Sequence, residues 1–287
     1  MSDSGARLTR SPEAPPTRGA DAPPTRRADA PPGRGNLIGF QTLVKRELYR
    51  TVAVINQVIW PPIITTVLYV LVFGVALGSR IPQIQGVSYA AYLVPGLIML
   101  QVIDATYSEV SSSVFQGRFM NSIQELLIAP LSAVEIVSGY VIASILRAWL
   151  IAALVLVVGA LLAHVLPTDW VLFFGVTALV AMLFSGLGIV FGLFAEKFDH
   201  IAVLTTFVIT PLVFVGGVFT STRLMPPLLR EVSLGNPMFY MIGAMRYAFT
   251  PTGDVPLPVA LGTLCVMTAV SLGLALRLTA IGYKLRV

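Results

Sequence analysis

Apolar runs long enough to cross a lipid bilayer recur from residue 52 onward, and a helix needs about 20 such residues to cross. The chain has 287 residues, of which 56% are hydrophobic and 11% are charged, and its mean hydropathy is +0.83. Soluble domains carry about 25% charged residues. The pattern predicts an all-α integral membrane protein with six transmembrane helices. We place them at residues 52–77, 88–110, 136–163, 170–195, 201–221 and 257–280.

The first 35 residues have a different composition. The stretches "APPTRGAD" (14–21) and "APPTRRAD" (22–29) repeat Ala, Pro, Arg and Asp, with no large apolar side chain. Such a segment cannot bury enough apolar surface to offset the entropy lost on ordering. We therefore expect residues 1–35 to be a disordered Pro/Arg-rich tail and residues 36–287 to form the transmembrane domain.

Lysine and arginine residues predict that both termini are cytoplasmic, because cytoplasmic loops carry the excess of positive charge. With that orientation the cytoplasmic segments hold Arg34, Lys45, Arg46, Arg50, Arg118, Lys197, Arg277, Lys284 and Arg286. The outer segments hold only Arg80, Arg223, Arg230 and Arg246.

The stretch before the first span, "NLIGFQTLVKRELYR" (36–50), predicts a helix lying in the headgroup plane. Its apolar side chains recur at spacings of three and four, at Leu37, Phe40, Val44 and Leu48. Lys45, Arg46 and Arg50 project away from that stripe. Further along, Pro61 and Pro62 should kink the first span or mark where an interfacial turn enters the membrane. Gly188 and Gly192 share one face of the fourth span, which permits close contact with another helix.

The connection between spans two and three, "QGRFMNSIQELLIAPLSAVE" (116–135), contains two helix starts. Ser122 with Glu125 and Ser132 with Glu135 both fit the S-x-x-E capping box. The first helix is short, residues 123–129, because Pro130 stops it, and the second leads into span three. Adjacent spans need a connection of only a few residues. This longer segment is either a helix resting on the membrane surface or a docking element for a soluble partner.

Four stretches in the same order resemble one transporter family. They are "SIQELLIAPLSAVEIVSGYV" (122–141), "PGLIMLQVIDATYSEV" (95–110), "FGLFAEKFDHIAVLTTFVITPLVFVGGVF" (191–219) and "NPMFYMIGAMRY" (236–247). Together they make the chain similar to ABC type-2 exporter permeases over residues 37–287. The closest resemblance is to the half-size, six-span permeases of bacteria and archaea.

The resemblance implies a division of labour between subunits. In that family the amphipathic start is a connecting helix, and the segment after span two is a coupling helix that fits a separate ATPase subunit. Two permeases, here a homodimer, and two ATPases make the exporter, in the plasma or inner membrane and in contact with lipid. By position, the ATPase-coupling residues are Ile123, Glu125, Leu126, Leu127 and Pro130. ATP and Mg²⁺ are bound by the partner, so this chain has no cofactor and no ATPase site of its own.

Charged side chains inside the spans need partners, because a charge at mid-bilayer costs at least about 2.5–3.5 kcal/mol. For Asp104 in span two and Arg147 in span three, three interpretations are open: a mutual ion pair, separate contacts with the interface, or a role in substrate passage. In the similar family, spans two and five line the route. The candidates for a polar role within the membrane are Gln101, Asp104, Tyr107, Arg147, Thr205, Thr206 and Thr210.

Residues 220–256 are too interrupted by proline to span and too apolar for a solvated loop, so we expect re-entrant short helices before span six. The family resemblance implies an outer gate there, with Asn236, Pro237 and Arg246 as candidate residues. Arg246 either holds that gate through carboxylate or carbonyl partners or is a plain interfacial anchor.

No motif indicates an active site. The chain lacks G-x-x-x-x-G-K-[ST], G-x-S-x-G, H-E-x-x-H and CxxC, and nothing points to a metal or to nucleic acid. His164 and His200 fall in loops on opposite sides of the membrane. Two other functions are considered: an ion-coupled secondary transporter that uses Asp104 and Glu109, and a membrane lipid-processing protein. The cargo does not follow from the sequence.

Overall fold

The computed structural model describes residues 37–78, 83–84, 86–119, 132–221, 225–251 and 253–282. The chain divides into two units, Met1–Arg34 and Gly35–Val287, and every described residue belongs to the second. The predicted tail (1–35) and the predicted coupling helix (123–129) therefore lie outside the described residues.

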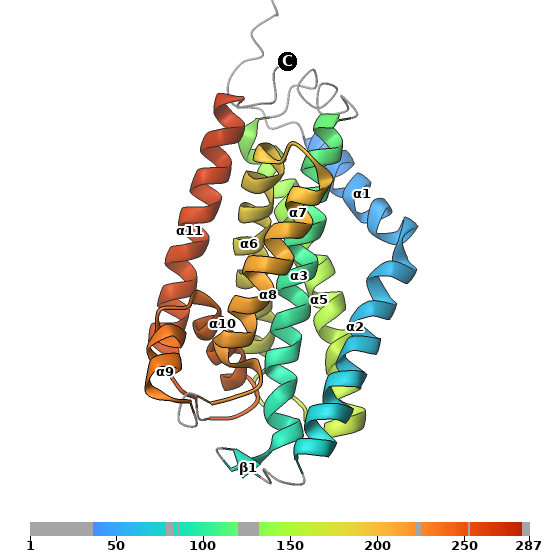
Figure 1. Cartoon of the computed structure of the whole chain (residues 1–287). Coiled ribbons are helices and arrows are strands. Elements are labelled where there is room, and N and C mark those ends of the chain that lie inside the picture. Colours follow the sequence, from blue (N-terminus) through green and yellow to red (C-terminus); the bar gives the residue numbers. More distant parts are fainter. Residues whose placement is uncertain are drawn as a thin grey trace, which may run out of the picture. The chain divides into compact units, whose positions relative to one another are not determined.

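Six helices of the described part are long and apolar enough to cross a membrane (Figure 1). They are Ile55–Gly74, Tyr89–Phe119, Ala133–Ala163, Trp170–Phe194, Phe198–Val218 and Leu257–Ile281. This number confirms the six predicted spans of an all-α membrane protein. The second span continues to Phe119, well beyond the predicted end at residue 110, because the polar residues after Glu109 remain helical.

The chain enters its first span later than predicted. Helix α1 (Leu37–Ala53) ends at a break at Val54, and α2 (Ile55–Tyr69) then begins and continues into the π-helical segment η1 (Val70–Leu77). Pro61 and Pro62 lie inside α2, so the turn that precedes the span is at Val54 and not at the prolines. The side chains of α1 that are buried against the bundle are Leu43, Glu47 and Thr51.

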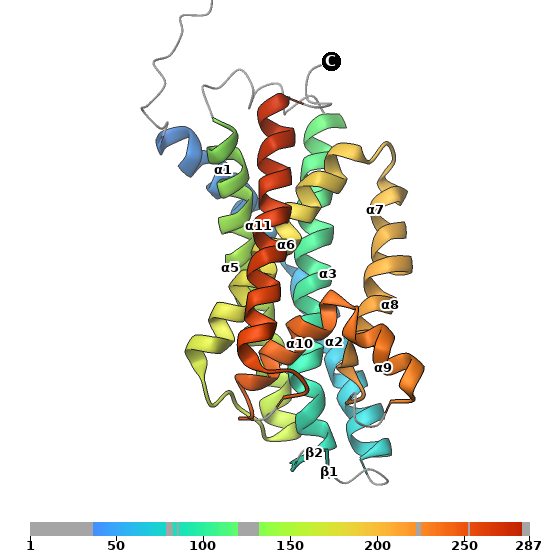
Figure 2. The same ribbon diagram turned by 90° about the vertical axis from the view of Figure 1, so that its left-hand side faces the viewer.

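Helices α3 (Tyr89–Phe119) and α6 (Trp170–Phe194) form the centre of the bundle, with α5 (Ala133–Ala163) and α11 (Leu257–Ile281) beside them (Figures 1 and 2). The most apolar stretches of α3 and α6 are each 72% buried within the protomer, whereas that of the first span is only 17% buried. The first span therefore presents most of its side chains to lipid or to another subunit.

Two glycines explain how closely α3 and α6 pack. A Cβ atom built on Gly192 would lie 2.8 Å from the Ser111 carbonyl oxygen, and one on Gly188 would lie 3.2 Å from the Tyr107 carbonyl oxygen. Both positions face backbone of α3, so a side chain there would separate the helices. The structure confirms the close contact predicted from Gly188 and Gly192.

Span five is the least regular span. It consists of α7 (Phe198–Leu204), η2 (Thr205–Ile209), α8 (Thr210–Val213) and η3 (Phe214–Val218), of which η2 and η3 are π-helical. Pro211 cannot donate to the helical ladder, and the chain leaves helical geometry at Gly217, whose φ is 94°. Such turns within a helix are frequent at functional sites.

Two short helices, α9 (Pro227–Leu234) and α10 (Pro237–Tyr247), connect spans five and six. They lie at one end of the bundle, close to the two-residue strands β1 (Gln83–Ile84) and β2 (Val87–Ser88), which pair as a hairpin (Figure 1). Helix α1 and the last turn of α11 lie at the opposite end (Figure 1). The hairpin is an addition to the predicted all-helical fold.

Candidate functional site

Four charged side chains join α1 to α3 and α5. Arg50 Nη2 lies 2.6 Å from Glu109 Oε1 and 3.4 Å from Glu47 Oε2. Arg147 Nη2 lies 3.3 Å from the same Glu109 oxygen, so two guanidinium groups share one carboxylate. The Glu47 and Arg147 side chains are each 4% exposed. A third guanidinium group, that of the more exposed Arg46, lies 3.3 Å from Glu47 Oε1, so both carboxylates have cationic partners, which lowers the cost of burying them.

Hydroxyl groups complete this cluster. Ser113 Oγ donates to Glu47 Oε2 over 2.9 Å, and Arg147 Nε donates to Thr51 Oγ1 over 3.1 Å. The Thr51 hydroxyl in turn donates to the Glu47 carbonyl oxygen over 3.0 Å. Buried charges are stable only when such hydrogen bonds accompany them. We call this set the ion network; its members are Glu47, Arg50, Thr51, Glu109, Ser113 and Arg147.

Of the three interpretations left open for Asp104 and Arg147, the ion network rules out the mutual ion pair. Arg147 pairs with Glu109 instead, and Asp104 is exposed on the protomer. At about 100° of rotation per residue, Asp104 and Glu109 project from α3 about 140° apart, so they cannot both face α5. Sequence reasoning also assigned Arg50 to the outer basic face of its helix. The sequence does contain a sign of the packed face, because Leu43, Glu47 and Thr51 recur every four residues. This spacing places the acidic Glu47 on the same helix face as Leu43.

A second contact fixes the last turn of α3. Arg118 Nη1 donates to the carbonyl oxygens of Gly192, Leu193 and Ala195, over 3.1, 2.7 and 3.0 Å. These carbonyls end α6, where the last oxygens of a helix have no partner within it. A cation at this position also complements the helix dipole. Arg118 therefore ties the end of α3 to the end of α6.

A capping box opens α5. Glu135 N donates to Ser132 Oγ over 3.2 Å, and Ser132 N donates to Glu135 Oε2 over 2.7 Å. This confirms the second of the two predicted helix starts. The first, at Ser122, and the coupling candidates Ile123, Glu125, Leu126, Leu127 and Pro130 lie outside the described residues. Arg118 and the Ser132 box are thus the nearest described anchors on either side of residues 120–131.

The polar candidates of span two lie beside those of span five. Ser108 Oγ of α3 is 3.5 Å from Thr205 Oγ1 of η2, and Thr210 Oγ1 donates to the Thr205 carbonyl oxygen over 2.9 Å. Asp104 and Thr206 are exposed on the protomer, whereas Gln101 and Tyr107 are buried. Of the predicted set, the structure therefore places Thr205 against α3, whereas Arg147 contacts α1.

At the other end of the bundle, Arg246 of α10 connects several elements. Its Nη2 donates to the Gly217 carbonyl, its Nη1 lies 3.5 Å from Asp254 Oδ2, and its Cζ lies 3.9 Å over the Tyr92 ring. The side chains of Arg246 and Asp254 are 3% and 1% exposed. This burial is incompatible with a plain interfacial anchor.

Asn236 and Pro237 begin α10. Asn236 Oδ1 accepts from Met238 N over 3.0 Å, while its Nδ2 donates to the Leu212 carbonyl of span five. Pro237 occupies the first helical position, where its missing N–H leaves no gap in the ladder. The three outer candidates therefore all lie on α10 or its cap, in contact with span five.

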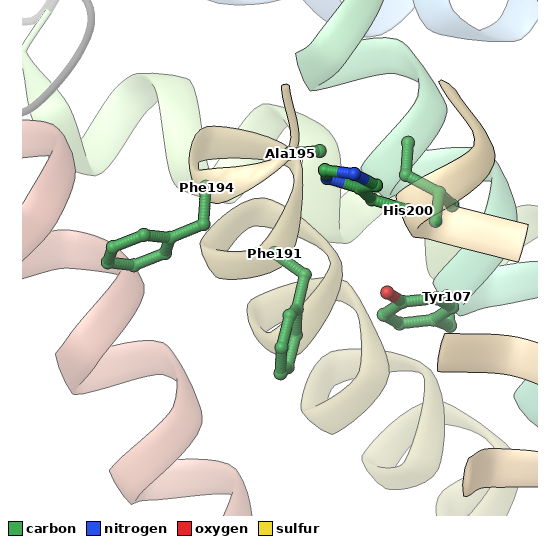
Figure 3. A pocket seen from close by; sticks show the side chains of 6 residues that line it. Tyr107, Phe191, Phe194, Ala195 and His200 are labelled. Atoms are coloured by element: carbon green, nitrogen blue, oxygen red, sulfur yellow. The ribbon is translucent and has the colours of Figure 1, made fainter. Parts of the chain in front are cut away.

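Beside Tyr107 the structure has a cavity of about 180 Å³, bordered by Phe191, Phe194, Ala195, His200 and Ile201 (Figure 3). A second cavity of about 190 Å³ adjoins it and has apolar walls. Within the described residues, no group of three or more His, Cys, Asp or Glu side chains is placed to hold a metal ion.

Comparison with known proteins agrees with these features. The sequence model of the ABC-2 type transporter family matches residues 38–250. The chain is 39% identical to the inner membrane transport permease YadH of Escherichia coli K12 over 229 residues, which are 80% of this chain and 90% of that protein. It is 26% identical to nodulation protein J of Neorhizobium galegae over 202 residues, 69% and 76% of the two chains.

Proposed function

This chain belongs to the ABC-2 type transporter family, and on that premise we propose that it is the permease subunit of an ATP-driven exporter in the inner membrane. Family membership makes it the membrane subunit of an ABC transporter, which associates with an ABC ATPase. Export, dimerisation and coupling are the proposed part. ATP and Mg²⁺ bind to the ATPase, and this chain supplies the route and the surface on which the ATPase acts.

The observation that carries the coupling proposal is the anchoring of both sides of residues 120–131. On one side, Arg118 holds the ends of α3 and α6 together. On the other, the Ser132–Glu135 box starts α5. A force applied to Ile123, Leu126 or Leu127 would reach three spans through these anchors. The ion network extends the connection to α1, whose described residues lie at the same end of the bundle (Figure 1).

Burial within the protomer supports a homodimer. The most apolar stretches of the first, fifth and sixth spans are only 17%, 39% and 28% buried, and the first and fifth are the two proposed to contact a partner copy. Large apolar side chains are exposed on both, among them Trp60, Ile64 and Phe207. Asp104 and Thr206 are also exposed, and polar groups facing lipid are costly. We propose that a second copy covers part of this surface, that Gln101, Asp104, Thr205, Thr206 and Thr210 border the route between the copies, and that lipid covers the rest.

The outer end fits a gate built on α10. Arg246 links α10 to spans two and five and to Asp254 before span six. Asn236 adds a direct contact from the α10 cap to span five. We propose that α9 and α10 are re-entrant helices and that the ion pair between Arg246 and Asp254 holds the gate closed. We further propose that both termini are cytoplasmic.

The ion-coupled alternative loses one of its two carboxylates. Both Arg50 and Arg147 contact the Glu109 carboxylate, so Glu109 belongs to the ion network and is not a free carboxylate of the route. In that alternative, Asp104 would be the only one of the two carboxylates left to bind the coupling ion. A lipid-processing enzyme would need a cluster of reactive polar groups at one interface, whereas the polar clusters described above are ion pairs and helix caps.

The decisive experiment is co-purification of the full chain with an ABC ATPase encoded next to it. We expect Leu126→Asp and Leu127→Asp, made together, to abolish ATPase binding and the hydrolysis that it stimulates. Leu228→Asp is the matched control, because this exposed leucine lies on α9, at the end of the bundle away from the last turn of α3 and the start of α5. Size-exclusion chromatography checks that each variant is folded. Transport driven by an ion gradient in proteoliposomes containing this chain alone would refute the exporter.

A further inference from the structure

The cavity beside Tyr107 lies among α3, α6 and α7. Figure 3 shows the Tyr107 ring on one side, Phe191 facing it, and the His200 imidazole at the border. Its volume is about 180 Å³. A cavity of about 150 Å³ in a protein core is large enough to bind benzene, so this one accommodates a ligand group.

The Tyr107 hydroxyl, which lies near the Ser111 side chain, is buried and forms no hydrogen bond of normal geometry with the described residues. The residue is 1% exposed, and its Oη has no hydrogen-bond partner among the described residues. The Ser111 hydroxyl, one turn along α3, donates instead to the carbonyl oxygens of Tyr107 and Ser108. Figure 3 shows the Tyr107 oxygen directed into the space between Phe191 and His200. Buried polar groups are nearly always paired, and for this hydroxyl the cavity is the space in which a partner can lie.

The adjoining cavity, about 190 Å³, shares two aromatic wall residues with the first. Tyr107 and Phe191 border both cavities, and their ring centroids are 6.1 Å apart in an edge-to-face arrangement. The wall includes Met238, Met241 and Met267, whose flexible side chains adapt to irregular apolar groups. Combined, the two cavities lie just inside the lower end of the roughly 300–1,000 Å³ range of small-molecule sites.

The two cavities follow one another along the bundle. His200 lies near the start of α7, at the same end as α1, whereas the second cavity reaches α8, α10 and Met267 of α11 (Figure 2). The group that can form hydrogen bonds thus lies nearer the α1 end, and the apolar space lies deeper. This is the arrangement of a lipid-like molecule in one leaflet of a bilayer.

We propose that the two cavities together bind one amphiphile within each protomer. Its polar group, a carboxylate or another hydrogen-bond acceptor, accepts from Tyr107 Oη near His200, and its apolar chain occupies the second cavity behind Phe191. The ligand is either a resident membrane lipid or the cargo. Only the second source rests on the proposed export function; binding itself requires no ATPase.

The test uses the full chain in nanodiscs and one probe, palmitic acid carrying a diazirine in its chain and a terminal alkyne. After photolysis, labelled peptides are identified by mass spectrometry. We expect labelling of the cavity walls that contain Met241 and Leu183, saturating with probe concentration. Tyr107→Phe should weaken half-saturation about five- to tenfold, the effect of losing one hydrogen bond. Met241→Trp should fill the apolar cavity and reduce labelling at least as much.

Tyr140→Phe is the matched control, because Tyr140 of α5 is also buried, its hydroxyl likewise lacks a hydrogen-bond partner, and it lies outside both cavities. Labelling of that variant should equal wild type. Adding the ATPase and ATP identifies the source, since cargo would leave the site during turnover and a resident lipid would remain. Labelling that maps elsewhere, or that is unchanged in both Tyr107→Phe and Met241→Trp, would overturn the proposal, whatever the ATPase does.

Discussion

The Arg50 guanidinium of α1 lies 2.6 Å from the Glu109 carboxylate of α3, so the helix that precedes the first span is tied to the second span by a direct ion pair. The same Arg50 nitrogen donates to the Glu109 carbonyl oxygen over 3.0 Å. One side chain thus holds both the side chain and the backbone of its partner. Motion of α1 relative to α3 would have to break both contacts.

Arg50 and Glu109 should be energetically coupled. We expect Arg50→Met and Glu109→Gln each to lower the free energy of unfolding, and the double variant to lose less than the sum. The expected coupling energy is about 0.5–3 kcal/mol, the range for residues in one ion network. Unfolding in mixed micelles as the SDS fraction is raised measures all three variants. Strictly additive losses would show that the pair contributes nothing.

Arg147 should matter more for stability than Asp104. Arg147→Met leaves the buried ion network with one guanidinium fewer, and we expect a loss of about 3–5 kcal/mol. Asp104→Asn changes an exposed side chain and should stay within about 0.5 kcal/mol of wild type. Arg147→Lys keeps the charge and should fall between them. Equal destabilisation by Asp104→Asn and Arg147→Met would instead support an ion pair between Asp104 and Arg147.

Arg118 should stabilise the junction of α3 and α6. We expect Arg118→Met to cost about 1.5–3 kcal/mol, as for one charge-assisted hydrogen bond, because a single nitrogen serves all three carbonyls. Its effect on stimulated ATP hydrolysis should be larger than its effect on membrane insertion. Arg277→Met is the control, since Arg277 is an exposed arginine near the same end of the bundle. If Arg118→Met and Arg277→Met lower the free energy of unfolding equally, the effect comes from surface charge and not from the contact with α6.

Gly192 should be intolerant of a methyl group. In Gly192→Ala the new Cβ would lie 2.8 Å from the Ser111 carbonyl oxygen, so α3 and α6 must separate, and we expect a loss of about 1–3 kcal/mol. Gly175→Ala on the same helix meets nothing within 4 Å and should be neutral or stabilising by up to about 1 kcal/mol. Thermal unfolding of the two variants in one detergent makes the comparison. An unaffected Gly192→Ala would contradict the backbone contact.

The parts of the fold that depend on local pattern could be predicted from the sequence. Apolar run length gave six spans, the Ser132–Glu135 spacing gave the start of α5, and the Gly188–Gly192 spacing gave a tight helix contact. Each depends on residues within a few turns of one another. The predicted coupling segment around Leu126 remains a prediction, since it lies outside the described residues.

Features that depend on how separate helices are rotated and offset could not be predicted. The partner of Arg147 is set by which side of α3 faces α5, and the positions of Asp104, Glu109 and Arg147 along the sequence do not reveal that side. Arg118 was counted only as a basic residue near a span end, although its partners are backbone carbonyls that carry no sequence signal. The unpaired hydroxyl of Tyr107 likewise depends on what surrounds it, which periodicity does not reveal.

The glycine contact between α3 and α6 also limits how this subunit can switch. Two helices in backbone contact, and fastened at their ends by Arg118, cannot slide or roll past one another without opening a gap. They therefore act as a single rigid body. If the subunit works as the proposed exporter, its moving part has to lie elsewhere, and span five, with its π-helical turns and the break at Gly217, has the least regular backbone of the described spans.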